Sequence, residues 1–354
     1  MNHFEKIAAR LKDRGLDAML ITSEPGEFYA MGFHGEGAAL ITPDKTWYYT
    51  DSRYIEAARQ LIAGAEVADW APGGGFRKLI AGLVKEHGVA KLGFEERYMS
   101  VASHTEWTKA VEAEFVPASE LLTQLRQVKD ADELAAMREA QRITDEALLE
   151  ILNFIKPGLT ESEVAARLTY IMARKGAERN SFDPIVACGA NGSKPHAVPG
   201  PAVIEKGQFV TMDFGCVVGG YCSDMTRTVA IGQPSEEMEL VYNTVLKAQL
   251  AGIAVARAGV TGKEVHQAGA KVIADAGYGD YFGHGFGHSL GIEIHEDPGF
   301  HNRNDKPIPA GALLSAEPGI YLPGRFGVRI EDGIMLTEEG CVDITRSPKQ
   351  LIIL

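Results

Sequence analysis

The segment Phe282-Gly-His-Gly-Phe-Gly-His-Ser-Leu-Gly-Ile-Glu-Ile-His-Glu296 holds three of the ten histidines of the chain and two glutamates. Its glycines, at positions 283, 285, 287 and 291, disfavour a helix, since each interior glycine costs roughly 1 kcal/mol relative to alanine. In the extended backbone that is expected instead, His284 and His288 can face one side, while His295 has the opposite parity. One imidazole of this segment is predicted to bind a metal and another to contact a substrate, if the chain also supplies carboxylates.

An internal repeat in the second half of the chain indicates where those carboxylates lie. A capping-box signature at Thr160 and Glu163 recurs at Thr261 and Glu264, each time behind a long helical segment. Each half then continues from two helices into a pair of strands. The repeat predicts a pseudo-symmetric domain with a site on its axis.

Two acids occupy equivalent positions in each repeat. Residues 206–215 align without a gap with residues 310–319, which matches Asp213 with Glu317, and a second acid follows each of them, Asp224 and Glu331. A loop of odd length around residues 322–325 would place the two glutamates face to face. Each acid alone fits a solvated strand face, but the four repeat-related positions together favour a common site.

The first strand pair is expected to turn at Gly219-Gly220, because a two-residue hairpin turn often needs positive φ at both positions. That turn sets a register in which Asp213 lies opposite Thr226 and Asp224 lies opposite Gly215. Residues opposite each other share a face, so both aspartates are predicted to project to the same side of the sheet.

The four acids have largely apolar neighbours in the sequence and therefore need compensating positive charge, because a buried carboxylate is costly unless it is paired or metal-bound. Only Arg227 and Arg329 are close to them in sequence. Two divalent metal ions, with His288 as an imidazole ligand, are the simplest compensation, and they would activate a water as a hydroxide nucleophile and polarise a carbonyl. Oxygen-rich ligation with one imidazole favours Mn²⁺, or Co²⁺ or Fe²⁺, over a structural zinc.

Residues 1–125 follow a different pattern, in which helical and strand segments alternate. Strands are expected at 16–22, 37–42, 46–50, 66–68 and 91–94, with helical segments between them. The alternation predicts an α/β layer domain. Polarity rises from residue 125, and the acidic helix start at Asp130 places the predicted domain boundary between residues 125 and 126.

Composition excludes several functional classes. The 354 residues exceed what one hydrophobic core usually serves, so two domains are expected. With 48 acidic and 35 basic residues the net charge is −13, which argues against a nucleic-acid partner. The apolar region 240–259 contains Lys247 and Arg257, so no membrane span is expected. The N-terminus alternates charges with Phe4, Ile7 and Leu11 and lacks the apolar core of a signal peptide, so the predicted location is cytoplasmic. The cysteines are expected to be thiols, although a hairpin could pair two of them.

Five motifs follow one another along the second half of the chain: MDFG at 212–215, SDMTRT at 223–228, HGFGHSLG at 284–291 with IHE at 294–296, AEPGIY at 316–321 and VRIEDG at 328–333. Their order resembles that of the pita-bread metallopeptidases, within the proline-specific branch of Xaa-Pro dipeptidases (prolidases) and Xaa-Pro aminopeptidases. The resemblance covers essentially the whole chain. It implies an α/β (α+β) protein with an N-terminal creatinase/prolidase-like domain at 1–125 and a pseudo-two-fold pita-bread catalytic domain at 126–354.

The resemblance implies a role for each ligand position. Asp213 would bind one metal, His288 and Glu317 would bind the other, and Asp224 and Glu331 would bridge the pair. Glu317 would also relay a proton from the water to the leaving nitrogen. The implied cofactors are two divalent metal ions, most of all Mn²⁺, with Co²⁺, Zn²⁺ or Fe²⁺ as alternatives.

Further residues match substrate-side positions of the family. His196 and His295 would contact substrate and steady the tetrahedral intermediate, and His284 would line the pocket. Arg329 would orient the bridging glutamate or the substrate. Tyr321 resembles a residue near the metals. For His196, a loop histidine after a Lys-Pro turn is the alternative interpretation.

Two positions depart from the family pattern. Phe286 stands where the family has a small or β-branched residue, and Ser289 stands where it has glycine, so a bulkier pocket wall is expected. The five ligand positions are intact, which argues against the non-metal branch, such as creatinase, and against inactive members.

The implied activity is hydrolysis of the peptide bond before proline in a di- or oligopeptide. An X-Pro bond lacks an N–H, so an enzyme that grips the scissile N–H cannot process it normally, whereas metal-based hydrolysis does not need it. An Xaa-Pro dipeptidase is expected. The alternatives are an Xaa-Pro aminopeptidase on longer peptides and an inactive binding module. A homodimer is also implied, with the N-terminal domain bordering the partner's active site.

Overall fold

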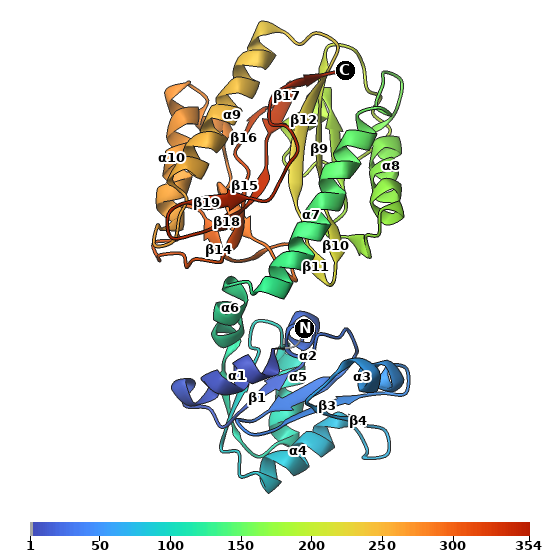
Figure 1. The fold of residues 1–354 in the computed structure, drawn as a ribbon, viewed down its shortest axis with the longest axis vertical. Coiled ribbons are helices and arrows are strands. Elements are labelled where there is room, and N and C mark those ends of the chain that lie inside the picture. Colours follow the sequence, from blue (N-terminus) through green and yellow to red (C-terminus); the bar gives the residue numbers. More distant parts are fainter. Residues whose placement is uncertain (1–2) are drawn as a thin grey trace. The chain divides into compact units, whose positions relative to one another are not determined.

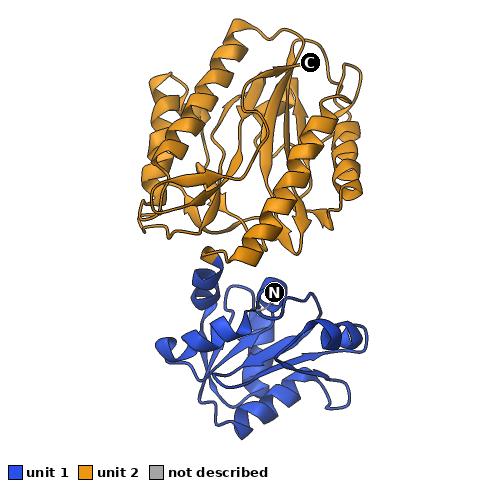
Figure 2. Cartoon of the chain, viewed as in Figure 1, with its two compact units in different colours: residues 1–126 blue, residues 127–354 orange. Residues whose placement is uncertain are grey.

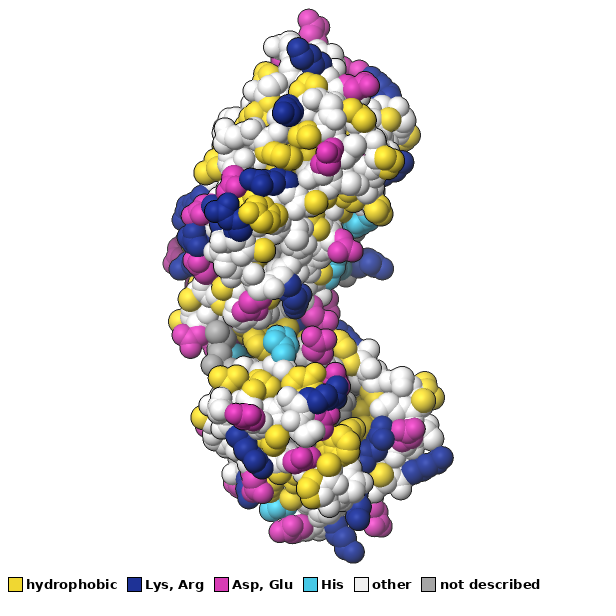
Figure 3. Space-filling model, turned by 90° about the vertical axis from the view of Figure 1, so that its right-hand side faces the viewer, with side chains coloured by type: hydrophobic (Ala, Val, Ile, Leu, Met, Phe, Trp, Pro, Cys, Tyr) yellow, Lys and Arg dark blue, Asp and Glu magenta, His cyan; other side chains and the backbone are white. Residues whose placement is uncertain are grey.

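The computed structural model describes residues 3–354 and separates the chain into two units, residues 1–126 and 127–354 (Figure 2). On the face drawn in Figure 3, acidic and basic side chains are interspersed on each unit. Within the described part of the chain, none of the helices has both the length and the apolar character that crossing a membrane requires. The cysteines Cys188, Cys216, Cys222 and Cys341 are all free thiols, as predicted.

Unit 1 contains one sheet with helices around it (Figure 1). Its strands are β1 (Ala18–Ile21), β2 (Ala38–Ile41), β3 (Thr46–Thr50), β4 (Glu66–Asp69), β5 (Lys91–Phe94) and β6 (Glu114–Pro117). Its helices are α1 (Phe4–Leu11), α2 (Glu24–Met31), α3 (Ile55–Leu61), α4 (Phe76–Glu86), α5 (Val101–Ala110) and α6 (Ser119–Gln127), the last of which ends at the unit boundary. The strand order is β4-β3-β2-β1-β5-β6, with β2 antiparallel to both neighbours and the other pairs parallel. Every position of β1 and β2 is buried, as expected for a sheet covered on both faces.

Glu27 on α2 is a buried carboxylate inside unit 1. Its oxygens accept hydrogen bonds from the backbone N–H groups of Gly35 and Gly37, at 2.7 and 3.1 Å, and from the Tyr48 hydroxyl at 2.6 Å. These donors favour the charged form, but burial outweighs them and raises the pKa of Glu27 to about 7. The folded protein therefore binds a proton at Glu27 more tightly than the unfolded chain does.

We expect the stability of unit 1 to fall as the pH rises from 4.5 through about 7. A carboxyl whose pKa is raised by folding stabilises the fold fully only below its unfolded pKa, and the contribution is lost as the pH passes the folded value. The change from 4.5 to about 7 corresponds to about 3 kcal/mol. Urea unfolding at pH 5 and pH 8 measures it, and Glu27→Gln should lack this part of the pH dependence. The same dependence in both proteins would contradict the assignment.

Unit 2 combines two helix pairs with four small sheets. Its strands are β7 (Arg179–Asn180), β8 (Ile185–Cys188), β9 (Gln208–Phe214), β10 (Cys216–Val218), β11 (Tyr221–Cys222), β12 (Met225–Ile231), β13 (Gly287–Ser289), β14 (Glu296–Phe300), β15 (Leu313–Ala316), β16 (Gly319–Leu322), β17 (Phe326–Arg329), β18 (Asp332–Leu336), β19 (Cys341–Asp343) and β20 (Ile352–Ile353). Its helices are α7 (Ala131–Ile151), α8 (Glu161–Arg174), α9 (Glu236–Val255) and α10 (Gly262–Asp275), and the short 3₁₀ helix η2 covers Gly189–Ser193. The sheet orders are β11-β10-β7, β20-β12-β9-β8, β14-β13-β15-β18-β19 and β16-β17.

The predicted repeat is visible in the way unit 2 is built. Both predicted capping boxes are present: Thr160 with Glu163 begins α8, and Thr261 with Glu264 begins α10. In Figure 1 the strands of unit 2 lie between the helices α7 and α8 and the helices α9 and α10. The first pair packs on β8, β9 and β12, and the second pair packs on Phe209 of β9 and Ala230 of β12 as well as on β14 to β18. The two halves therefore enclose one shared set of strands, on which the predicted acids stand.

Candidate metal centre

The β9–β12 hairpin places the two aspartates on one face of its sheet. Val218 pairs with Tyr221 around the Gly219-Gly220 turn, where both glycines have positive φ, 56° and 76°. The same register pairs Asp213 with Thr226 and carries Asp224 opposite Gly215, as predicted. A Cβ at Gly215 would lie 2.0 Å from the backbone oxygen of Ser223, so the two chains approach this closely only because residue 215 is glycine.

The second strand pair brings the two glutamates opposite each other. Leu322 pairs with Phe326 across a loop of three residues, 323–325, so the loop has the odd length that was expected. Ala316 pairs with Asp332 in the same register. Glu317 and Glu331, the next residues inward, therefore face one another from the ends of β15 and β17.

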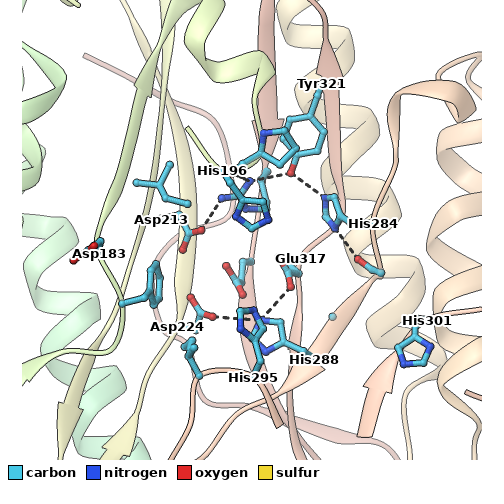
Figure 4. A pocket seen from close by; sticks show the side chains of 18 of the residues that line it. Asp183, His196, Asp213, Asp224, His284, His288, His295, His301, Glu317 and Tyr321 are labelled. Carbon is cyan, nitrogen blue, oxygen red and sulfur yellow. Dashed lines mark hydrogen bonds and ion pairs between the residues drawn. The ribbon is translucent and has the colours of Figure 1, made fainter. Parts of the chain in front are cut away.

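His288 joins the two pairs of acids from β13. Its Nε2 lies 3.5 Å from Asp224 Oδ2 and 3.3 Å from Glu317 Oε1, and both carboxylates point toward the ring in Figure 4. The Ser315 hydroxyl accepts a hydrogen bond from the His288 backbone N–H at 3.0 Å. Ligand atoms of Asp224, His288 and Glu331 lie within 4.8 Å of one another, close enough to share a metal ion.

Burial controls the electrostatics of this cluster. Asp224 is 5% exposed and Glu331 is 1% exposed. Burial, and then the neighbouring carboxylates, raise the pKa of both groups well above the ordinary range, and burial also raises the pKa of Glu317. Burial lowers the pKa of His288, which favours the neutral imidazole that a metal ion requires.

The donor set fits divalent cations. Asp213 Oδ1, Asp224 Oδ1 and Glu331 Oε1 are buried, and within residues 3–354 none of these oxygens has a hydrogen-bond partner. Buried polar atoms are normally paired, so three orphaned carboxylate oxygens in one cluster indicate a missing partner of positive charge. Oxygen ligands with one imidazole suit hard or borderline divalent ions.

Arg329 contacts a different acid from the one expected. Its Nη2 lies 2.6 Å from Asp213 Oδ2, and its Nε donates to the Thr226 hydroxyl at 3.0 Å. That hydroxyl in turn donates to Glu331 Oε2 at 2.6 Å. Arg329 therefore reaches Glu331 only through Thr226. The sequence did not single out Thr226, although the predicted hairpin register already placed it opposite Asp213.

The other predicted residues line one cavity of about 490 Å³ above the acids. His284 Nε2 is hydrogen-bonded to the Tyr321 hydroxyl at 2.9 Å, and Arg329 donates to the same hydroxyl at 2.9 Å. His196 lies on the cavity wall as well (Figure 4). The structure thus brings together residues from both halves of unit 2.

The predicted opposite orientation of His295 is wrong. Its ring lies against the ring of His288, with centroids 4.3 Å apart. The register of β13 with β14 shifts between His288 and Ser289, and the chain bends before β14, so the alternation of an extended strand does not continue to residue 295.

The expected bulkier pocket wall is also wrong. The Phe286 side chain is 0% exposed and does not line the cavity. It occupies a gap beside Gly252 of α9 and Gly269 of α10, where an added Cβ would lie 2.2 and 2.4 Å from the ring. The Ser289 hydroxyl donates to the backbone oxygen of Leu313 at 2.9 Å and is buried. Both departures from the family pattern are therefore part of the core.

Five pocket residues were not foreseen from the sequence: Phe182, Asp183, Ile185, His301 and Arg303. Asp183 and His301 stand on opposite sides of the pocket in Figure 4. These residues lie outside the repeated motifs, and no local pattern marks them. Only the folding of separate segments around the cavity brings them to it.

Four carboxylates and an imidazole line one cavity and form a cluster that fits divalent metal ions, as in a metal-dependent enzyme. The chain belongs to metallopeptidase family M24, whose sequence signature matches residues 135–338, and residues 4–128 match the creatinase/prolidase N-terminal domain. The protein is therefore a metallopeptidase, a hydrolase that depends on divalent metal ions.

Known relatives are similar over the whole chain. The uncharacterised peptidase YqhT of Bacillus subtilis is 44% identical over 352 residues, 99% of each chain. The solved structure of an Xaa-Pro dipeptidase from Bacillus anthracis is 43% identical with a TM-score of 0.95, covering 99% of each chain. An X-Pro aminopeptidase from Thermotoga maritima MSB8 is 36% identical with a TM-score of 0.92, covering 98% of this chain and 100% of that one. These likenesses confirm the predicted family and the pita-bread fold behind a creatinase/prolidase-like domain.

Proposed function

We propose that the chain hydrolyses the peptide bond before proline, as an Xaa-Pro dipeptidase with two divalent metal ions, most of all Mn²⁺. The observation that carries the proposal is the convergence of four carboxylates and His288, with three orphaned oxygens, on the floor of one cavity. The dipeptidase and aminopeptidase named among the similar structures support the same substrate class.

In this proposal Asp213 would hold one metal ion, His288 and Glu317 would hold the other, and Asp224 and Glu331 would be ligands of both. When bound there, the two cations would polarise the scissile carbonyl and lower the pKa of a water, which would supply a hydroxide nucleophile at neutral pH. The ring contact of His288 with Asp224 and Glu317 supports this assignment.

The protein's own groups carry the proton and stabilise charge. Glu317 accepts the proton of the attacking water and delivers it to the proline nitrogen, which has no hydrogen of its own and must gain one to leave. The Ser315 hydroxyl donates to Glu317 Oε1 at 3.1 Å and fixes that oxygen. His295 and His196 stand on the cavity side and donate to the carbonyl oxygen as negative charge develops there.

A guanidinium at the cavity favours dipeptides over longer peptides. The Arg329 guanidinium is already bonded to Asp213, Thr226 and Tyr321. Arg303 also lines the cavity, and its exposed side chain makes no hydrogen bond or ion pair within the described residues 3–354. In an Xaa-Pro dipeptide the proline ends in a free α-carboxylate, which gives this guanidinium a charged partner. In a longer peptide the same position is a neutral amide.

We expect Arg303→Ala to lower kcat/KM for Ala-Pro by about tenfold, because an exposed charge-assisted hydrogen bond is lost. Hydrolysis of Ala-Pro-amide, which lacks the carboxylate, should stay unchanged. Lys306→Ala, a substitution of an exposed cation in the same loop, is the matched control. An equal loss on both substrates would contradict the assignment of Arg303 to the carboxylate.

Turnover of Ala-Pro and Ala-Pro-Ala by the Mn²⁺-loaded protein tests the proposed function. We expect Ala-Pro to be cleaved faster, and a chelator to abolish cleavage of both. Faster cleavage of Ala-Pro-Ala would identify an aminopeptidase. A protein that binds no Mn²⁺, Co²⁺ or Zn²⁺ and cleaves neither peptide would leave the binding module as the remaining interpretation.

The homodimer and the cytoplasmic location remain proposals. Sedimentation equilibrium of the purified chain tests the first, and fractionation of cells tests the second. A monomer at micromolar concentration would exclude a stable dimer.

A further inference from the structure

Glu161 is a buried carboxylate that has no part in the proposed ligand set. It is 0% exposed and stands at the first position of α8. The first backbone N–H groups of a helix and its dipole stabilise a negative charge there. The hydrogen bonds of its carboxylate are made to the loop 188–200, whose first residue, Cys188, is also the last residue of β8.

The two ends of that loop meet at this carboxylate. Glu161 Oε1 accepts from the backbone N–H of Cys188 at 2.8 Å, and Oε2 accepts from the backbone N–H of Gly200 at 3.1 Å. The side-chain amide of Asn191 donates to both oxygens, at 3.1 and 3.3 Å. One carboxylate therefore ties the start, the first turn and the end of the loop 188–200.

The loop carries His196, whose imidazole has no hydrogen-bond partner of its own in residues 3–354, so the loop backbone is what holds this residue at the cavity. The ring is exposed. The backbone near it is fixed at two further points. Gly192 packs so closely on Gly327 of β17 that a Cβ at residue 327 would lie 2.0 Å from the Gly192 oxygen, and Arg329 donates to the Pro195 oxygen at 3.3 Å.

We propose that Glu161 is a positioning residue for peptide hydrolysis, because it fastens both ends of the loop that holds His196 over the metal-ligand cluster. This inference rests on the proposed function. The hydrogen bonds of the Glu161 carboxylate go to the loop and not to the five proposed ligands, so its effect should pass through His196 and leave metal binding intact. A group that only supports the fold would lower stability without a selective effect on turnover.

The test uses the Mn²⁺-loaded full chain with Glu161→Gln, His196→Ala, the double variant, and Glu163→Ala as control. The Glu163 carboxylate caps the same helix by bonding Thr160 instead of the loop. We expect Glu161→Gln to lower kcat by about 10- to 100-fold, with the affinity for Mn²⁺ unchanged. In the His196→Ala background the same substitution should have no further effect on kcat.

Two outcomes would overturn the proposal. One is that the losses from Glu161→Gln and His196→Ala multiply in the double variant, and the other is that Glu163→Ala lowers kcat as much as Glu161→Gln. If Glu161→Gln does not fold, Asn191→Ala is the alternative, because it removes only one of the donors that hold the loop to the Glu161 carboxylate. Its loss of kcat should likewise vanish in the His196→Ala background. An inactive wild-type protein would refute the proposed function instead, because the positioning role is measured as the kcat of each variant relative to the kcat of wild type.

Discussion

Asp224→Asn is expected to abolish Mn²⁺ binding and turnover while leaving the metal-free protein at least as stable as wild type. Burial and three neighbouring acids raise the pKa of Asp224. Its contribution to stability is full below the unfolded pKa and is lost as the pH rises through the folded value. At pH 8 an asparagine avoids the free-energy cost of a buried negative charge at this position. It also removes the negative oxygen that is proposed to bridge the metals. Because bound metal contributes several kcal/mol to the transition state, activity should fall by at least about a thousandfold.

Calorimetric Mn²⁺ titration, Ala-Pro turnover and thermal unfolding with and without Mn²⁺ measure these effects. Wild type should gain stability on adding Mn²⁺, and the variant should not. Asp275→Asn removes an exposed acid of α10 and is the charge-matched control. Retained activity in Asp224→Asn would show that the ligand assignment is wrong.

Arg329→Met is expected to destabilise the metal-free protein by about 3 to 5 kcal/mol, because it leaves the Asp213 carboxylate without its buried partner. The arginine is 4% exposed and is the only residue that forms an ion pair with Asp213 among residues 3–354. Its loss also frees the Thr226 and Tyr321 hydroxyls that it holds. Turnover should fall as well, since these groups surround the proposed ligands.

Added Mn²⁺ should restore much of that stability, because cations bound among the acids replace the missing positive charge. Urea unfolding of Arg329→Met with chelator and with Mn²⁺ measures the difference. Arg325→Met removes an exposed guanidinium from the loop between β16 and β17 and should cost little, since surface ion pairs contribute weakly. An equally large loss with and without Mn²⁺ would mean that Arg329 acts by packing and not by charge.

Strand register was predictable because turn chemistry is local. The Gly219-Gly220 turn and the three-residue loop after Leu322 set the parity on each strand. Parity alone then placed Asp213 beside Asp224, and Glu317 opposite Glu331. Capping boxes likewise depend on residues three positions apart, and both are present at Thr160 and Thr261.

Orientation was not predictable where the chain leaves regular structure. The register of β13 shifts after His288, and the following bend returns His295 to the same side. Phe286 turns into the core because Gly252 and Gly269, on two distant helices, leave a gap for its ring. Neither the bend nor the gap is visible within the segment itself.

Local sequence was enough to indicate which acids and which histidine come together in one cluster and which strands carry them, since alternation, turns and caps depend on near neighbours. Tertiary packing selected the acid that Arg329 pairs with, the direction of Phe286, and the loop that brings Arg303 to the cavity. It also brought the loop 188–200 into hydrogen-bonding contact with Glu161. These contacts join residues far apart in the chain. They depend on how two halves pack, and packing is selected by the free energy of the whole core and not by any short segment.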